Sequence, residues 1–198
     1  MKAILRIFLA TLICFSLFGC GEDTPAPLPN GGQSGSQTTE SQMPRGNQVG
    51  DLCYSFDVPL VNAEGDTGET LDPSATGRVT VINFWGTWCG PCVSELPHFE
   101  EFATNFADKA TVLAIHSTGD SNQVPDFIAE NYPESSIAFA RDPGTDYNGE
   151  FFTMMGGNGN YPFTIILDNA GIIRFKQVGT MDYAQLVSVI SEFDPSFA

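Results

Sequence analysis

Short apolar runs alternate with stretches of helical periodicity over most of this chain. The apolar runs predict strands, which cover Ser55–Val61, Glu69–Leu71, Val79–Trp85, Thr111–His116, Ile137–Ala140, Phe163–Asp168 and Ile172–Val178. The stretches with apolar residues three and four positions apart predict helices, which cover Pro91–Phe106, Val124–Asn131, Thr145–Met155 and Asp182–Phe193. This order of elements predicts an α/β domain, in which a central mixed sheet carries helices on both faces.

Two of the runs indicate the centre of this sheet. Val79–Phe84 and Val112–Ile115 are almost continuously apolar, which is typical of parallel strands covered on both faces. The turn sequence Asp168–Gly171 predicts that the last two strands form a hairpin.

The N-terminus has the pattern of a secretory signal peptide over residues 1–19. Lys2 and Arg6 precede the apolar run Ile7–Phe18, which is too short to span a bilayer comfortably. The end of the run, Leu17-Phe18-Gly19-Cys20, resembles a bacterial lipobox, although Phe18 departs from the small or branched residue usual there. That resemblance implies that Cys20 is acylated and anchors the protein outside the cytoplasm, on the outer face of the cell membrane or in the periplasm. A chance cysteine beside an ordinary cleavage site, or an uncleaved anchor, is the alternative.

Composition separates a tether from a folded domain. Residues 20–48 are rich in Gly, Ser, Gln, Pro and Thr and have little to bury, which predicts a disordered tether after Cys20. Residues 49–198 are enough for one domain with a proper core. The formal net charge of −16 argues against nucleic acid as a partner and against direct docking on anionic lipid.

The motif Trp88-Cys89-Gly90-Pro91-Cys92 directly follows the apolar run that ends at Trp85. A helix N-terminus stabilises a thiolate, and the Cys-x-x-Cys spacing lets two sulfurs on the first helical turn close a disulfide. Half of a zinc site is the main alternative, but tetrahedral zinc needs four ligands. Outside the signal region only Cys53, His98 and His116 remain, and none is paired with another at ligand spacing. We therefore expect thiol–disulfide chemistry with neither a metal nor a cofactor.

The motif is identical to the active site of the thioredoxin family. The N-terminal strands and a further helix–strand unit near residues 124–140 make the domain similar to the TlpA/ResA-like membrane-tethered thiol–disulfide oxidoreductases. The resemblance implies a thioredoxin-like fold with this unit inserted between the Cys-x-x-Cys helix and a strand that follows a cis-proline. Cys89 is expected to be the nucleophile and Cys92, one turn further into the helix and more shielded, the resolving thiol.

Further residues match the same family. Asn83 stands where thioredoxin has a buried aspartate, and the family pairs an asparagine there with a glutamate three residues after the second cysteine, here Glu95. Glu95 is therefore expected to accept the proton of Cys92 or to adjust both thiols, the alternative being a solvated helix glutamate. Pro97 matches the proline that kinks the active-site helix.

The bond Tyr161–Pro162 would be trans by base rates, but the resemblance implies a cis bond beside the sulfurs. There the backbone next to Pro162 would pair with an extended substrate, and Tyr161 would help to set substrate preference. Trp88 would shape the surface around the cysteines or pack partly into the core.

Three features stay open. Cys53 fits either a buried small hydrophobe or a third redox thiol. His116, at the end of its strand, could titrate near the cysteines or be structural, and His98 is expected at the surface or between helices. The glycine-rich segment 155–160 could be an adaptable rim of the site or a slack loop.

These features together predict a monomeric, membrane-tethered reductase of protein disulfides. Its substrates could be apocytochrome c cysteines or misoxidised secreted proteins, and the resemblance implies a membrane electron donor of the CcdA/DsbD type. A disulfide oxidase or isomerase would use the same site in another direction. A metal-delivery module of the Sco type would instead use Cys-x-x-x-Cys, and the Pro-x-x-x-Thr-x-x-Cys pattern of peroxiredoxins is absent around Cys89.

Overall fold

The structure is a computed structural model that describes residues 43–117, 121–143 and 148–198. The signal peptide, Cys20 and residues 20–42 of the expected tether lie outside the described residues. Within the described part of the chain, no helix combines the length and the apolar character needed to cross a membrane.

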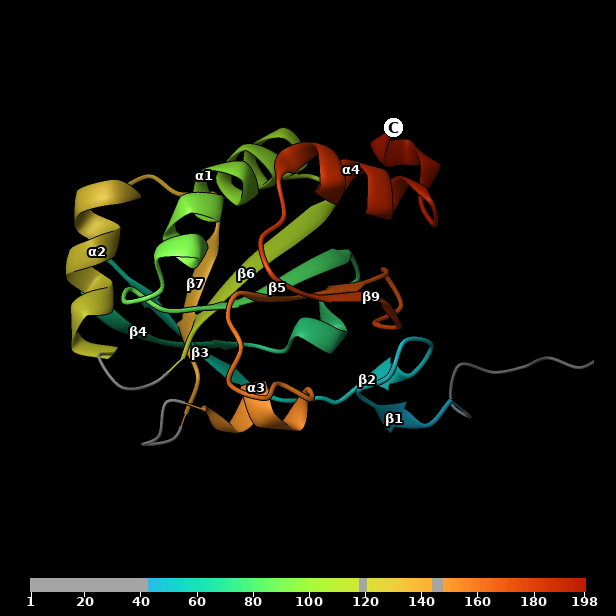
Figure 1. Cartoon of the computed structure of the whole chain (residues 1–198), viewed down its shortest axis with the longest axis horizontal. Coiled ribbons are helices and arrows are strands. Elements are labelled where there is room, and N and C mark those ends of the chain that lie inside the picture. Colours follow the sequence, from blue (N-terminus) through green and yellow to red (C-terminus); the bar gives the residue numbers. More distant parts are fainter. Residues whose placement is uncertain (1–42, 118–120, 144–147) are drawn as a thin grey trace, which may run out of the picture. The chain divides into compact units, whose positions relative to one another are not determined.

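A seven-stranded mixed sheet forms the centre of the domain, in the order β4-β3-β7-β6-β5-β8-β9 (Figure 1). Its strands are β3 (Val58–Asn62), β4 (Gly65–Leu71), β5 (Val79–Trp85), β6 (Ala110–His116), β7 (Ala138–Arg141), β8 (Phe163–Leu167) and β9 (Ile173–Val178). Strands β5, β6 and β7 run parallel, whereas β8 pairs antiparallel with both β5 and β9. The predicted mixed sheet and its closing hairpin are confirmed.

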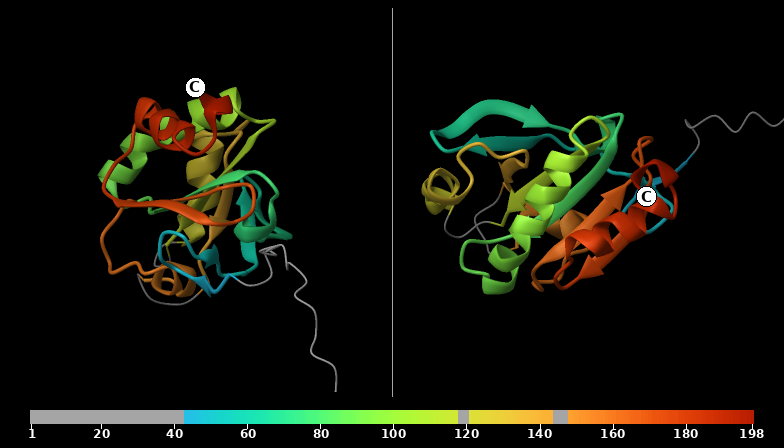
Figure 2. Two further views of the ribbon diagram at one scale, coloured as in Figure 1. Left: turned by 90° about the vertical axis from the view of Figure 1, so that its right-hand side faces the viewer. Right: turned by 90° about the horizontal axis from the view of Figure 1, so that it is seen from above.

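Helices cover both faces of this sheet. Helices α1 (Gly90–Asn105) and α4 (Tyr183–Ser191) lie side by side on one face, and α3 (Glu150–Met154) lies on the other (Figures 1 and 2). Helix α2 (Val124–Asn131) packs in the same core cluster as α1. This is the thioredoxin-like arrangement that the resemblance implied.

Strand β5 is buried on both faces, which accounts for its mostly apolar sequence. All seven residues of β5 are buried, and its five apolar residues divide between two core clusters. Val81 and Trp85 pack with the residues of α1, whereas Ile82 and Phe84 pack with Phe152 of α3 on the other face.

The folded domain begins earlier than predicted. Arg45–Gly46 (β1) pairs in parallel with Leu52–Cys53 (β2), forming a small separate sheet. The Lys176 ammonium on β9 donates to the Asn47 carbonyl oxygen at 2.6 Å. Residues 45–48 therefore belong to the domain, and the predicted boundary before Val49 was too late.

Helix α3 is shorter than the predicted helix Thr145–Met155, part of which lies outside the described residues. The buried carboxylate of Asp142 accepts the N–H groups of Phe151 and Phe152 at 2.9 and 2.8 Å. A carboxylate in this position satisfies N–H groups that a helix start leaves unpaired, so the helix begins at Glu150.

Candidate functional site

The turn between β5 and α1 carries the two cysteines. The Cys89 N–H donates to the Gly86 carbonyl oxygen at 3.0 Å, which closes the turn, and Cys89 is the N-cap residue of α1. Pro91 lies in the first turn of α1, where a missing N–H leaves no helical bond unmade and the fixed φ favours the helix. Pro97 lies inside the same helix.

Cys89 and Cys92 form a disulfide, with their Cα atoms 5.2 Å apart. The Cys89 sulfur also accepts the backbone N–H of Cys92 at 3.3 Å. Cys89 is 7% exposed and Cys92 is fully buried, so an incoming group reaches the Cys89 sulfur first. When the disulfide is reduced, the N–H and the helix N-terminus both favour a thiolate on Cys89.

Glu95 lies one turn beyond Cys92 and is 2% exposed. Its carboxylate accepts the Asn83 amide N–H and the Met181 backbone N–H, each at 2.8 Å. Asn83 Nδ2 also donates to the Thr164 hydroxyl at 3.2 Å. Burial raises the pKa of Glu95 to about 7, although both hydrogen bonds oppose that shift. The alternative of a solvated helix glutamate is therefore wrong.

The peptide bond Tyr161–Pro162 is cis and lies beside the turn between β5 and α1. It immediately precedes β8, whose first residue pairs with Phe84 near the end of β5. The Tyr161 ring contacts the Trp88 ring edge-on at 5.3 Å between centroids and stacks on Phe152 at 4.5 Å. Trp88 is 45% exposed, so it shapes the surface beside the cysteines and is not part of the core.

His116 reaches the same turn from β6, pairing in register with Trp85. The imidazole is fully buried, and its Nε2 accepts the Thr87 N–H at 3.0 Å. Burial, with a smaller contribution from Arg141, lowers the pKa of His116 to about 4, so the ring is neutral at physiological pH. The sequence placed His116 at the correct edge of the sheet, but nothing in it pointed to this hydrogen bond.

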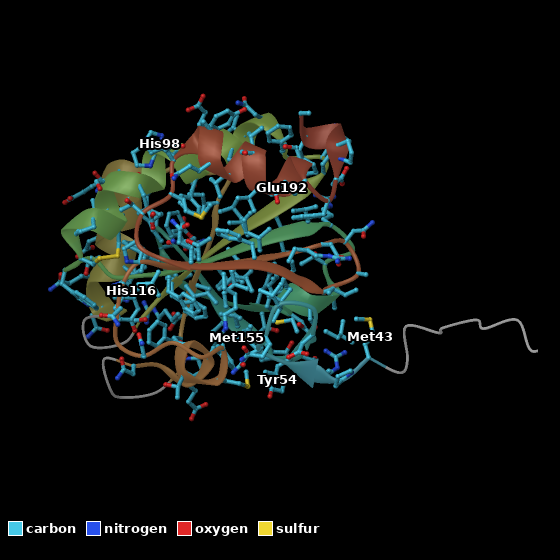
Figure 3. All side chains as sticks on the ribbon, turned by 45° about the vertical axis from the view of Figure 1, so that its right-hand side comes forward. Met43, Tyr54, His98, His116, Met155 and Glu192 are labelled. Atoms are coloured by element: carbon cyan, nitrogen blue, oxygen red, sulfur yellow. A yellow bond between two sulfur atoms is a disulfide. The ribbon has the colours of Figure 1, made fainter. Side chains whose placement is uncertain are left out.

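The other open residues lie away from the two sulfurs. His98 is exposed on α1 (Figure 3). Cys53 is fully buried, its sulfur lies 3.9 Å from that of Met155, and burial raises its pKa to about 12. A thiol in this state is unreactive, which matches the predicted buried hydrophobe.

The first residues of the segment 155–160 are held by packing and by a hydrogen bond. Met155 is fully buried and its carbonyl accepts from the Lys176 ammonium at 2.9 Å. A Cβ atom on Gly157 would lie 2.5 Å from the Phe152 ring, so glycine allows the close approach. This start of the segment packs closely and is not slack.

Within residues 43–117, 121–143 and 148–198, no three or more His, Cys, Asp or Glu side chains are grouped so that they could hold a metal ion.

Comparison with known proteins places the chain in a family. The family model described as Redoxin matches residues 41–190. The thioredoxin-like protein YneN of Bacillus subtilis is 36% identical over 110 residues, which are 54% of this chain and 60% of that protein. The thiol-disulfide oxidoreductase ResA of Bacillus cereus is 26% identical over 120 residues, 60% of this chain and 65% of that protein. The chain thus spans less than two thirds of the length of these two relatives.

A solved structure shows the same fold. The exposed lipoprotein thioredoxin Etrx1 of Streptococcus pneumoniae superposes with a TM-score of 0.58 at 22% identity, covering 70% of this chain and all of that one. With the family model matched over most of its length, the chain belongs to the Redoxin family.

Proposed function

We propose that this protein is a thiol–disulfide oxidoreductase that reduces protein disulfides through Cys89 and Cys92. The observation that carries the proposal is the Cys89–Cys92 pair at the N-terminus of α1, with the more accessible sulfur at the N-cap. The names of relatives such as ResA support the same chemistry. Tyr161 and Pro162 provide the backbone beside which an extended substrate would lie.

The reaction proceeds by two exchanges. The Cys89 thiolate attacks one sulfur of a substrate disulfide, a mixed disulfide forms, and the other substrate sulfur leaves as a thiolate that takes a proton from solvent. Cys92 then loses its proton and attacks the Cys89 sulfur, which breaks the mixed disulfide and releases the second substrate thiolate. Two electrons have passed from the cysteine pair to the substrate.

Glu95 serves as the proton acceptor for Cys92 in the second exchange. It lies one helical turn from Cys92 and is held by Asn83 and Met181. With a pKa of about 7, its carboxyl group both takes up and releases a proton near neutral pH.

The proposal includes a place in the cell. Cys20 carries the lipid anchor and the following tether lets a monomeric domain work outside the cytoplasm. A reductase there needs electrons, which a membrane thiol donor of the CcdA/DsbD type supplies. Cys20→Ala should release the protein from the membrane fraction and abolish incorporation of labelled fatty acid, whereas unchanged fractionation would refute the anchor.

The reduction potential of the Cys89–Cys92 pair tests the direction of electron flow. Equilibration with glutathione or dithiothreitol buffers should give a value near or below about −230 mV, in the range of thioredoxin and glutaredoxins. A value near about −120 mV would instead make the protein an oxidant.

Cysteine variants test the mechanism. Cys89→Ser should abolish reduction of an insulin disulfide, and Cys92→Ser should accumulate mixed disulfides with the substrate. Cys53→Ala is the matched control, because its thiol is buried away from the pair, and it should retain activity. Normal turnover by Cys92→Ser would show that the two-thiol mechanism is wrong.

A further inference from the structure

The turn that presents Cys89 is held by a side chain from a different strand. Thr87 lies between the end of β5 and the start of α1, and its N–H donates to His116 Nε2 at 3.0 Å. The Thr87 hydroxyl lies 3.4 Å from the same nitrogen. Because β5 and β6 run parallel with Trp85 opposite His116, the imidazole lies directly beside the residues that follow Trp85.

The hydrogen bond from the Thr87 N–H identifies Nε2 as the accepting nitrogen of the His116 ring. The ring is fully buried and meets Trp85 edge-on at 5.1 Å between centroids. Among the described residues, two charged residues on the neighbouring segment face His116: Arg141, its register partner on β7, and Asp142, whose backbone N–H donates to the His116 carbonyl. A neutral imidazole that accepts at Nε2 carries its hydrogen on Nδ1. Nδ1 itself has no hydrogen-bond partner among the described residues.

We propose that His116 is a positioning residue for the thiol pair, holding the Thr87 amide so that the turn presents Cys89 at the start of α1. This role rests on the proposed exchange function. His116 does not touch the sulfurs and acts through the backbone between Thr87 and Cys89.

Three contacts define this turn, and His116 makes one of them. The Gly86 carbonyl accepts the Cys89 N–H, and the Trp88 indole lies so close over Gly86 that an added Cβ would meet it at 2.6 Å. Without an acceptor at His116, the partly buried Thr87 N–H would have to turn to find a new partner. That movement would shift Trp88 and Cys89 and would weaken the bond between the Cys92 N–H and the Cys89 sulfur.

Two variants separate positioning from packing. His116→Phe keeps a flat ring but removes the acceptor, whereas His116→Gln can place an amide oxygen near the position of Nε2. We expect His116→Phe to lower the rate constant for alkylation of reduced Cys89 at pH 7 by about tenfold, the loss that corresponds to one hydrogen bond. We expect His116→Gln to recover most of this loss.

Val112→Ala is the matched control because it creates a defect in the same strand, β6, at a buried position further from the turn. It should lower the stability but leave the alkylation profile and the glutathione equilibrium of the pair within about twofold of the wild type. The proposal is wrong if His116→Phe matches the wild type in both the alkylation rate of Cys89 and the glutathione equilibrium of the pair. It is also wrong if His116→Gln lowers the alkylation rate as much as His116→Phe does.

A measurement on the unmodified full-length protein covers the case in which His116→Phe does not fold. Nitrogen-15 NMR of the histidine rings should show His116 with its hydrogen on Nδ1 from pH 6 to 8, and a hydrogen on Nε2 would overturn the proposal. Alkylation reports on the Cys89 thiol directly, and the nitrogen-15 spectrum reports on the His116 ring directly. A wild-type protein that reduces no substrate disulfide would therefore refute the proposed function while leaving the positioning role to be decided by these data.

Discussion

Replacing Glu95 with glutamine tests the burial of its carboxyl group. Glutamine keeps the size of the side chain and one acceptor oxygen, but its NH₂ group cannot accept from both Asn83 and Met181 as the carboxylate does. One of these N–H donors therefore loses its partner, at a cost of about 1–3 kcal/mol. The glutamine has no proton to release, so this cost should be the same at every pH.

The wild-type protein has an additional cost that does depend on pH. The pKa of Glu95 is about 7 in the folded protein, against an ordinary value of 4.5 in the unfolded chain. Below pH 4.5 the group is protonated in both states and burial costs little. Between pH 4.5 and 7 the unfolded chain releases its proton first, so the free energy of unfolding falls as the pH rises. Above pH 7 the full cost, about 3 kcal/mol, is present.

The assay is urea unfolding of the oxidised proteins between pH 4.5 and 8. The difference in unfolding free energy between Glu95→Gln and the wild type should shift by about 3 kcal/mol in favour of the variant across this range. Contributions from Asp142 and His116 cancel because both proteins contain them. Glu101→Gln is the matched control, because it replaces a glutamate on the same helix whose side chain is exposed. A constant difference for Glu95→Gln would refute the assigned pKa and, with it, the case for Glu95 as a proton acceptor near neutral pH.

Two substitutions and one labelling experiment probe the surroundings of the site. Gly86→Ala should push the exposed Trp88 ring aside. Insulin reduction should slow by about threefold to tenfold, while thermal unfolding should show little loss of stability. An unchanged rate of insulin reduction would show that Trp88 does not contact the substrate. Cys53, whose pKa is raised to about 12 by burial, should resist Ellman's reagent in the folded protein and react only on unfolding, and rapid native labelling would reopen a redox role. Lys176→Met should lower the free energy of unfolding by about 1–3 kcal/mol, because its ammonium holds the Asn47 and Met155 carbonyls, and an unchanged urea midpoint would contradict this.

Much of the fold could be predicted from the sequence because burial patterns are local. The run Val79–Trp85 is mostly apolar, and the structure buries it on both faces between a parallel and an antiparallel neighbour. The turn sequence at Asp168–Gly171 likewise joins an antiparallel pair. Prediction failed where an element depends on a distant partner. Residues 45–48 lack apolar side chains and were predicted to belong to the tether, but contacts with Lys176 and β2 hold them in the domain.

The candidate site divides in the same way. The residue types and spacing of Cys89 and Cys92 were sufficient to predict that the two sulfurs lie together at the start of a helix and can form a disulfide. The surroundings of Glu95 were not predictable, since Asn83, Thr164 and Met181 come from three separate segments. His116 was also undecided, because a histidine at a strand end can be exposed or buried, and its partner Thr87 is 29 residues away.

Burial favours the neutral form of both Glu95 and His116. It raises the pKa of the acid Glu95 and lowers that of the base His116, and each shift favours the neutral form. The thiolate of Cys89 is therefore not stabilised by a histidine cation at this turn. Its described stabilisation comes from the Cys92 N–H and the start of α1, both of which depend on how the turn is held. In the proposed mechanism His116 and Glu95 have distinct tasks: His116 accepts a backbone hydrogen bond and positions the turn, and Glu95 takes up the proton of the buried Cys92.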